Sequence, residues 1–302
     1  MIRPDVSAVL VNYNAGPELG KALQSIASEL SACEWEAIVV DNASSDGSVS
    51  IVSSFGPRVR LLANAVNVGF SRGVNQGVAA SAGRVLLIMN PDCRLVAGAF
   101  AYMRRELERS PGVAIVGPRI LDPDGSVQGS ARGDPDMFTG FFGRTTRLRR
   151  FLPDLSVSRR NVVTDAAVRH ADAVTVDWVS GACMVVRREA FDEVRGFDER
   201  YFLYWEDADL CRRLRARGYK IRYVPTATAV HRVGQSSRKA RKAAIRAFHE
   251  SAYLYYATHV APESAPKRVV ARILLTARSW VHLRRSAPQA PLGSAAGGPP
   301  AE

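Results

Sequence analysis

Short apolar runs alternate with segments of helical spacing along the first 90 residues. The runs that predict buried strands, because they are apolar and rich in β-branched residues, span 6–13, 37–40, 58–62 and 84–89. The intervening segments predicted as helices span 18–30, 45–54 and 73–81. This alternation predicts a doubly wound, mostly parallel α/β sheet, which binds ligands beyond the carboxyl ends of its strands. Asp41 and Asp92 both follow such strand ends.

The second half of the chain is less regular. Further strands are expected over 113–117, 174–179, 182–187 and 220–224, the last one stopped by Pro225, with a helix over 207–217. Residues 133–172 lack clear periodicity, which is typical of a long functional or mobile segment. Residues 286–302 are rich in Pro, Gly and Ala and are expected to be disordered.

Two amphipathic helices are expected before this tail. The second helix carries an apolar stripe formed by Val269, Val270, Ile273, Leu274, Ala277, Trp280 and Val281. A cationic helix with an aromatic residue on its apolar face is typical of binding at a membrane interface. Packing on its own domain or on a second subunit is the alternative, and the excess of positive charge favours the membrane.

The charge is concentrated at this end of the chain. Residues 232–285 hold 12 Lys or Arg and two Glu, whereas the whole chain of 302 residues has a net charge of +12. The concentration predicts an anionic partner. We therefore divide the chain into a catalytic domain (1–235), a basic amphipathic helical extension (236–285) and a disordered tail (286–302).

Other features bear on the cellular compartment. The four cysteines are far apart, with no C-x-x-C pair, which suits a reducing cytoplasm. The chain begins without a signal-peptide pattern, and no run of 18 apolar residues predicts a membrane span.

An acidic cluster, Glu206, Asp207 and Asp209, lies between aromatic residues and a basic helical segment. Neighbouring carboxylates can have their pKa values pushed apart, so that one of them serves as a general base. The alternative is an acidic first turn favoured by the helix dipole. Asp209 is expected to cap the helix.

Four stretches, taken in order, carry a resemblance to a known family. They are Val39–Gly47, Asn67–Phe70, Met89–Asp92 and Trp205–Leu210. With this spacing the chain resembles the inverting nucleotide-sugar glycosyltransferases of family 2, which have the GT-A fold. Within them it looks most like bacterial rhamnosyltransferases that use dTDP-L-rhamnose. The resemblance covers residues 5–235.

The resemblance implies roles for matching residues. Asp207 would be the catalytic base, and Glu206 would bind the acceptor or orient the base. The residues implied in nucleotide-sugar binding are Asn12, Asp41, Asn67, Gly69, Asn90, Asp92 and Trp178. Asp92 and His231 would bind Mg²⁺ or Mn²⁺, with Asn90 departing from the family's Asp-x-Asp pattern.

Structural readings of the same residues stay open. Asp41 could close an Asx turn, Trp178 could belong to the core, and a lone histidine such as His231 is more often structural than a metal ligand.

The resemblance implies a metal-dependent inverting glycosyltransferase acting at the inner face of the cell membrane from the cytoplasm. The expected partners are a nucleotide-sugar donor, with dTDP-rhamnose favoured, a glycan or polyprenyl-diphosphate-linked acceptor, and an anionic membrane surface. Nucleic acid is not expected, and a homodimer stays open. The alternatives are a UDP- or GDP-sugar donor, a nucleotidyltransferase, or a nucleic-acid- or membrane-binding protein on a degenerate transferase fold.

Overall fold

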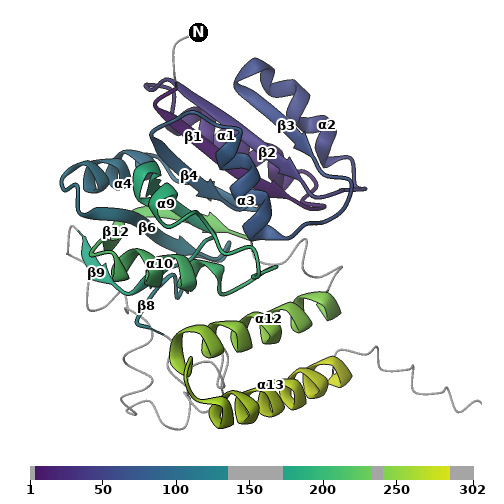
Figure 1. The fold of residues 1–302 in the computed structure, drawn as a ribbon. Coiled ribbons are helices and arrows are strands. Elements are labelled where there is room, and N and C mark those ends of the chain that lie inside the picture. The colour runs from purple at the N-terminus through teal and green to yellow at the C-terminus, as the bar shows by residue number, and fades with distance from the viewer. Residues whose placement is uncertain (1–3, 135–172, 233–240, 286–302) are drawn as a thin grey trace, which may run out of the picture.

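A computed structural model describes residues 4–134, 173–232 and 241–285 (Figure 1). Ten strands form one sheet in the order β3-β2-β1-β4-β11-β6-β12-β5, with β7 beside β6 and β9 beside β12, and β8 and β10 pair separately. The strands are β1 (Val6–Asn12), β2 (Trp35–Asp41), β3 (Val59–Ala63), β4 (Val85–Met89), β5 (Cys93–Leu95), β6 (Val113–Leu121), β7 (Val127–Gln128), β8 (Ala131–Arg132), β9 (Val174–Val176), β10 (Trp178–Val179), β11 (Cys183–Arg187) and β12 (Lys220–His231).

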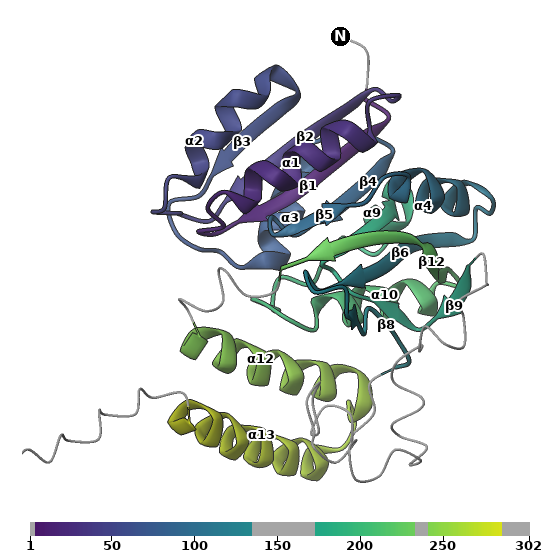
Figure 2. The same ribbon diagram turned by 180° about the vertical axis from the view of Figure 1, so that it is seen from behind.

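Helices flank the sheet and continue beyond it (Figure 2). They are α1 (Glu18–Glu29), α2 (Ser48–Val52), α3 (Phe70–Ala79), α4 (Ala99–Glu108), α9 (Arg188–Glu193), α10 (Glu206–Ala216), α12 (Arg241–Tyr255) and α13 (Ala265–Arg285), with a 3₁₀ segment η1 (Ser53–Arg58) and a π-helical segment η2 (Tyr256–Val260).

The strand directions confirm the expected mostly parallel sheet. β3, β2, β1 and β4 run parallel to one another, and β6 and β12 also form a parallel pair. β11 is antiparallel to both of its neighbours, β4 and β6. The parallel register pairs Asn12 with Asp41, so the polar ends of β1 and β2 meet at the same edge of the sheet.

Alternation along the strands fills two hydrophobic layers. In β1, Val6, Ala8 and Leu10 pack on the side of α1 and α4, whereas Val9 and Val11 pack on the side of α3 and α10. Successive side chains of a strand point to opposite faces, and a sheet covered on both faces therefore needs a continuous apolar run. This explains why the run at 6–12 carries so few polar residues.

The structure corrects several predicted elements. β12 does not stop at Pro225 but continues to His231, and its register with β6 shifts between Val224 and Thr228. A proline is tolerated inside a strand at such an irregularity because no ladder hydrogen bond is needed there. The pattern also missed β5, α4 and α9, whose short lengths or mixed composition hide their periodicity.

The expected amphipathic helices are present as α12 and α13. They pack against each other on one side of the α/β body, with α12 between the body and α13 (Figures 1 and 2). Among the described helices, none combines the length and the hydropathy needed to cross a bilayer. The predicted tail, 286–302, lies outside the described residues, as does most of the aperiodic segment 133–172.

Candidate functional site

Asn12 and Asp41 form a buried pair at the carboxyl ends of β1 and β2. The Asn12 amide donates to Asp41 Oδ1 at 2.7 Å, and also to the hydroxyls of Ser44 and Ser48. Asp41 Oδ2 accepts the backbone N–H of Ser44 at 2.9 Å. Asn12 is fully buried. Its hydrogen bonds hold Asp41 and the following turn in place. The Asp41 carboxylate bonds the backbone three residues on, so it holds the following turn without forming an Asx turn, and it is fixed at the predicted nucleotide edge.

A second network ties the Asn67–Phe70 loop to the same edge. Asn42 donates to Asn67 Oδ1 and to the Gly69 carbonyl, and Asn67 Oδ1 also accepts the Gly69 N–H. Gly69 has φ +89°, and a Cβ there would lie 2.6 Å from the Phe202 carbonyl oxygen. Phe70 N–H donates to that same oxygen at 2.7 Å. The close contact between this loop and the segment leading to the acidic cluster therefore requires glycine.

Asn90, Asp92 and His231 come together from β4 and β12. His231 Nε2 lies 3.2 Å from Asp92 Oδ1 and 3.3 Å from Asn90 Nδ2. The backbone N–H of Arg232 also donates to the Asp92 carbonyl at 3.0 Å. The long β12 that the sequence did not predict is what delivers the histidine to the aspartate.

Gln128 orients the His231 ring, a role that the sequence did not reveal. Gln128 Nε2 donates to the Asp122 carboxylate and to the His231 carbonyl, which leaves Gln128 Oε1 as the acceptor 3.1 Å from His231 Nδ1. With this assignment Nδ1 carries a proton and Nε2 turns its lone pair toward Asp92. A lone pair facing a carboxylate oxygen is a repulsive contact unless a proton or a metal ion lies between them.

Asp92 and His231 fit a divalent cation that takes only some of its ligands from protein side chains. No group of three or more His, Cys, Asp or Glu side chains suitable for a metal occurs within the described ranges. Asp92 and His231 would supply two ligands, and a bound diphosphate and water would supply the others, as is common for Mg²⁺.

Asp207 lies in the first turn of α10 and is held by backbone donors. Its Oδ2 accepts the Gly181 N–H at 2.9 Å, and its Oδ1 accepts the Ala208 N–H at 2.8 Å. The neighbouring Ala182 carbonyl accepts the Asn90 N–H at 2.9 Å. The turn at 180–182 thus connects the Asn90 end of the site to the Asp207 carboxylate, and it fixes the orientation of a candidate base.

Glu206 occupies a different environment from its neighbour. It is 6% exposed, and among the described residues its Oε2 has no hydrogen-bond partner. Burial, together with the negative charge of Asp207, raises the pKa of Glu206 well above its usual value. Of the adjacent acids, Glu206 is therefore the one that holds its proton more tightly, and Asp207 is the better candidate for the acceptor of a proton.

The backbone entering α10 is strained. Tyr204 and Trp205 have φ of +70° and +71°, a region that costs non-glycine residues about 1–2 kcal/mol each. Trp205 packs on Tyr255 and Phe248 of α12, with ring centroids 5.4 and 5.9 Å apart. Strained conformations persist where surrounding packing determines them, and they cluster at functional sites.

Asp209 does not cap α10, contrary to expectation. It is 1% exposed and pairs with Arg213 at 2.7 Å and with His259 Nε2 of η2 at 2.6 Å. A second contact, Ser251 Oγ to the Leu203 carbonyl at 3.0 Å, also joins the C-terminal helices to the acidic segment. The helical extension is therefore packed on the segment that carries the candidate catalytic acids.

Trp178 lies at the start of β10 and is partly buried. Its indole N–H donates to the Gly133 carbonyl at 3.0 Å, and the Arg132 guanidinium lies 5.3 Å from the ring centroid. Its ring packs against two hydrophobic clusters, which fits the core role, and its sugar-binding role stays a prediction.

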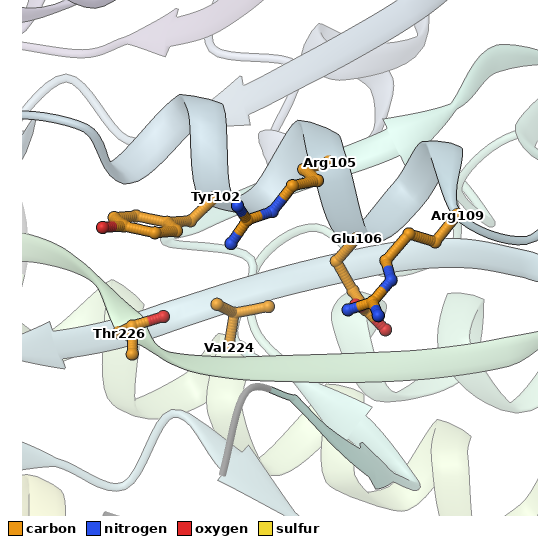
Figure 3. Close-up of a pocket in the computed structure, with 6 residues that line it drawn as sticks. All are labelled: Tyr102, Arg105, Glu106, Arg109, Val224 and Thr226. Carbon is orange, nitrogen blue, oxygen red and sulfur yellow. The ribbon is translucent and has the colours of Figure 1, made fainter. Parts of the chain in front are cut away.

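A small hollow of about 60 Å³ lies between α4 and β12 (Figure 3). It is lined by Tyr102, Arg105, Glu106, Arg109, Val224 and Thr226. None of the predicted site residues lines it, so it is separate from the polar strand ends.

Comparison with known proteins identifies relatives along almost the whole chain. The sequence model described as "Glycosyl transferase family 2" matches residues 7–195, and one described as "N-terminal domain of galactosyltransferase" matches residues 175–235. The N-acetylglucosaminyl-diphospho-decaprenol L-rhamnosyltransferase of Mycobacterium tuberculosis is 34% identical over 293 residues, covering 92% of each chain. Rhamnosyltransferase WbbL of Escherichia coli is 41% identical over 88 residues, which are 29% of this chain and 33% of that one.

Solved structures share the fold. A mannosyltransferase from Pyrobaculum calidifontis has a TM-score of 0.57 at 18% identity and aligns with 94% of this chain and 71% of its own. GalNAc-T7 has a TM-score of 0.59 at 16% identity, covering 91% of this chain and 55% of its own. The fold is thus the GT-A fold that the sequence resemblance implied.

Proposed function

The chain belongs to glycosyl transferase family 2, and from this premise we propose that it transfers L-rhamnose from dTDP-rhamnose to a sugar carried on a polyprenyl diphosphate. That the enzyme is a hexosyltransferase follows from the family and its rhamnosyltransferase relatives. The donor and acceptor are proposed because a relative with that activity is similar over 92% of both chains.

The donor would lie along the polar strand ends. Asp41 would accept an N–H from the nucleobase, and Asn67 and Gly69 would line the nucleotide loop. Asn90, Asp92 and His231 would meet the diphosphate. A divalent cation held by Asp92 and His231 would neutralise charge on the departing nucleoside diphosphate.

Asp207 would act as the general base. As the acceptor hydroxyl oxygen forms a bond to the anomeric carbon, its proton passes to the Asp207 carboxylate. The bond from the anomeric carbon to the diphosphate oxygen breaks on the opposite side, and the diphosphate leaves with the bonding electrons. Attack opposite the leaving group inverts the anomeric centre. The raised pKa of Glu206 disfavours a second negative charge beside the base.

The enzyme would work from the cytoplasm at the inner face of the membrane, where a polyprenyl-linked acceptor is anchored. A test is nucleoside diphosphate release from a panel of dTDP-rhamnose, UDP-sugars and GDP-sugars. Each donor is assayed with and without N-acetylglucosaminyl-diphospho-polyprenol, in Mn²⁺, Mg²⁺ or EDTA.

We expect acceptor-dependent release of dTDP from dTDP-rhamnose that EDTA abolishes. Release from a UDP- or GDP-sugar alone would contradict the donor assignment. Release of pyrophosphate in place of a nucleoside diphosphate would identify a nucleotidyltransferase.

A further inference from the structure

α13 presents an apolar stripe that no described residue covers. The exposed fractions of its largest members are 58% for Val269, 55% for Val270, 63% for Ile273, 48% for Leu274 and 53% for Trp280. Helical spacing places these side chains, with Ala277 and Val281, on one side of the helix. Contiguous exposed apolar surface of this kind marks an interaction site.

The stripe has a fixed direction because the opposite side of α13 is packed. Ala271 and Leu275 are buried, and the Arg272 guanidinium lies 4.6 Å from the ring centroid of Tyr253 on α12. Both views of the fold place α12 between α13 and the α/β body. The exposed stripe therefore faces away from the body.

Positive charge lies along one border of the stripe and at its far end. The basic residues within 241–285 are Arg241, Lys242, Arg246, Lys267, Arg268, Arg272, Arg278, Arg284 and Arg285, and the acidic ones are Glu250 and Glu263. Lys267 and Arg285 flank one border of the stripe by helical spacing. At its far end the Arg284 guanidinium stacks on Trp280, 3.5 Å from the ring centroid.

We infer that the α13 stripe docks the enzyme on an anionic lipid bilayer, with the helix lying in the plane of the interface. An apolar face inserted below the headgroups and a cationic border beside them is the arrangement that binds such surfaces. Each Lys or Arg near an anionic surface contributes about 1 kcal/mol. Two copies packed stripe to stripe would bring their basic borders together, so charge favours lipid over a second copy.

The purpose of this docking rests on the proposed function. Docking would also connect the membrane surface to the segment that carries Glu206 and Asp207. α13 packs on α12, and α12 contacts Trp205 and, through Ser251, the Leu203 carbonyl. A lipid-anchored acceptor would then meet an enzyme already held at its surface.

The test is co-sedimentation of the full chain with vesicles of equal parts phosphatidylglycerol and phosphatidylcholine, and with vesicles of phosphatidylcholine alone. Ile273→Asp places a charge on the stripe. Ala243→Asp adds the same charge to the exposed side of α12, off the stripe, and is the matched control. Sedimentation velocity without lipid reports self-association, and transfer to a water-soluble short-chain acceptor reports the activity.

We expect wild type and Ala243→Asp to bind the anionic vesicles. Ile273→Asp should bind at least about tenfold more weakly, because burial of an isoleucine side chain raises the binding affinity by about one to two factors of ten. All three proteins should turn over the short-chain acceptor equally. Equal vesicle binding by Ile273→Asp and Ala243→Asp would overturn the inference. So would a wild-type dimer that Ile273→Asp dissociates without any binding to vesicles.

Failure of the proposed function gives a different result. In that case the short-chain acceptor is not used by any of the proteins, whereas vesicle binding, which needs no substrate, still reports on α13.

Discussion

At the scale of residues, the two adjacent acids at the start of α10, Glu206 and Asp207, have different surroundings. Asp207 accepts backbone N–H groups, whereas Glu206 is buried with one oxygen lacking a partner among the described residues. A proton on Glu206 removes the repulsion between neighbouring carboxylates. The folded protein therefore depends on the protonation of Glu206 for part of its stability.

This dependence predicts how stability changes with pH. Because the folded pKa of Glu206 is raised, the folded state binds more protons than the unfolded state above the usual glutamate pKa of about 4.5. The free energy of unfolding must then fall as pH rises from there to the folded pKa, by at most about 1.4 kcal/mol per pH unit. Glu206→Gln removes this contribution. In denaturant titrations from about pH 5 to pH 8, wild type should lose stability relative to the variant as pH rises, and a constant difference would contradict the assignment.

The contacts between Gln128 and His231 predict that Gln128 supports metal binding. If Gln128 fixes the tautomer that turns Nε2 toward Asp92, Gln128→Ala should weaken Mn²⁺ binding by about 10- to 100-fold. Titration calorimetry with Mn²⁺ and the donor nucleotide measures the loss. Gln128→Glu keeps an acceptor facing Nδ1 and should retain more affinity than the alanine variant; equal losses would leave Gln128 with a packing role only.

Adding a side chain at Gly69 is predicted to have a measurable steric effect. Gly69→Ala combines an unfavourable positive φ with a clash against the Phe202 carbonyl, so the unfolding free energy should fall by about 1–3 kcal/mol or more. Gly47→Ala is the matched control, because Gly47 has φ +76° and no atom within 4 Å of the added Cβ. Equal losses in the two variants would show that the contact between the loop and Phe202 carries no constraint.

At the scale of elements, the C-terminal helices support the segment that carries the candidate catalytic acids. η2 places His259 on the buried Asp209, and α12 packs on the strained Trp205. The strain in Tyr204 and Trp205 would relax if this packing were lost, and Asp207 would move with it. Small displacements of a catalytic group can cost large factors in rate.

His259→Ala should therefore lower kcat by roughly 10- to 100-fold while the donor KM stays near the wild-type value. His259→Asn, which restores an N–H donor, should recover part of the loss. His282→Ala on α13 is the control and should have no effect. A rise in donor KM with unchanged kcat would mean that His259 does not act through the acids.

The elements also show what the sequence could predict. β1, β2 and β4 are covered on both faces, so their uninterrupted apolar runs were visible. The strand pattern placed Asp41 and Asp92 after strand ends, and the resemblance gave Asp207 the role of the base. β12 was cut short at Pro225 because the register shift that accommodates proline depends on β6, a distant partner. Gln128 and His259 were missed for a related reason: single polar residues carry no pattern, and their partners are 103 and 50 positions away.

At the scale of the whole molecule, the α/β body and α13 differ in the charge and the apolar surface that they carry. The α/β body carries the polar strand ends, and α13 carries the exposed stripe together with much of the positive charge. If α13 docks on lipid, binding should combine an ionic part with an apolar part. Raising the salt concentration should then weaken binding to anionic vesicles without abolishing it, and complete release in salt, measured by co-sedimentation, would indicate that the stripe does not insert.

The central claim is that Asp207 takes the proton of the acceptor in a rhamnosyl transfer. The most direct measurement is acceptor-dependent release of dTDP from dTDP-rhamnose by Asp207→Asn, beside Asp198→Asn, a matched substitution at an aspartate that pairs with Arg200 outside the site. We predict that Asp207→Asn loses about 10²- to 10⁴-fold in kcat with donor binding intact, while Asp198→Asn keeps the wild-type rate. Activity in Asp207→Asn equal to that of Asp198→Asn would contradict the account.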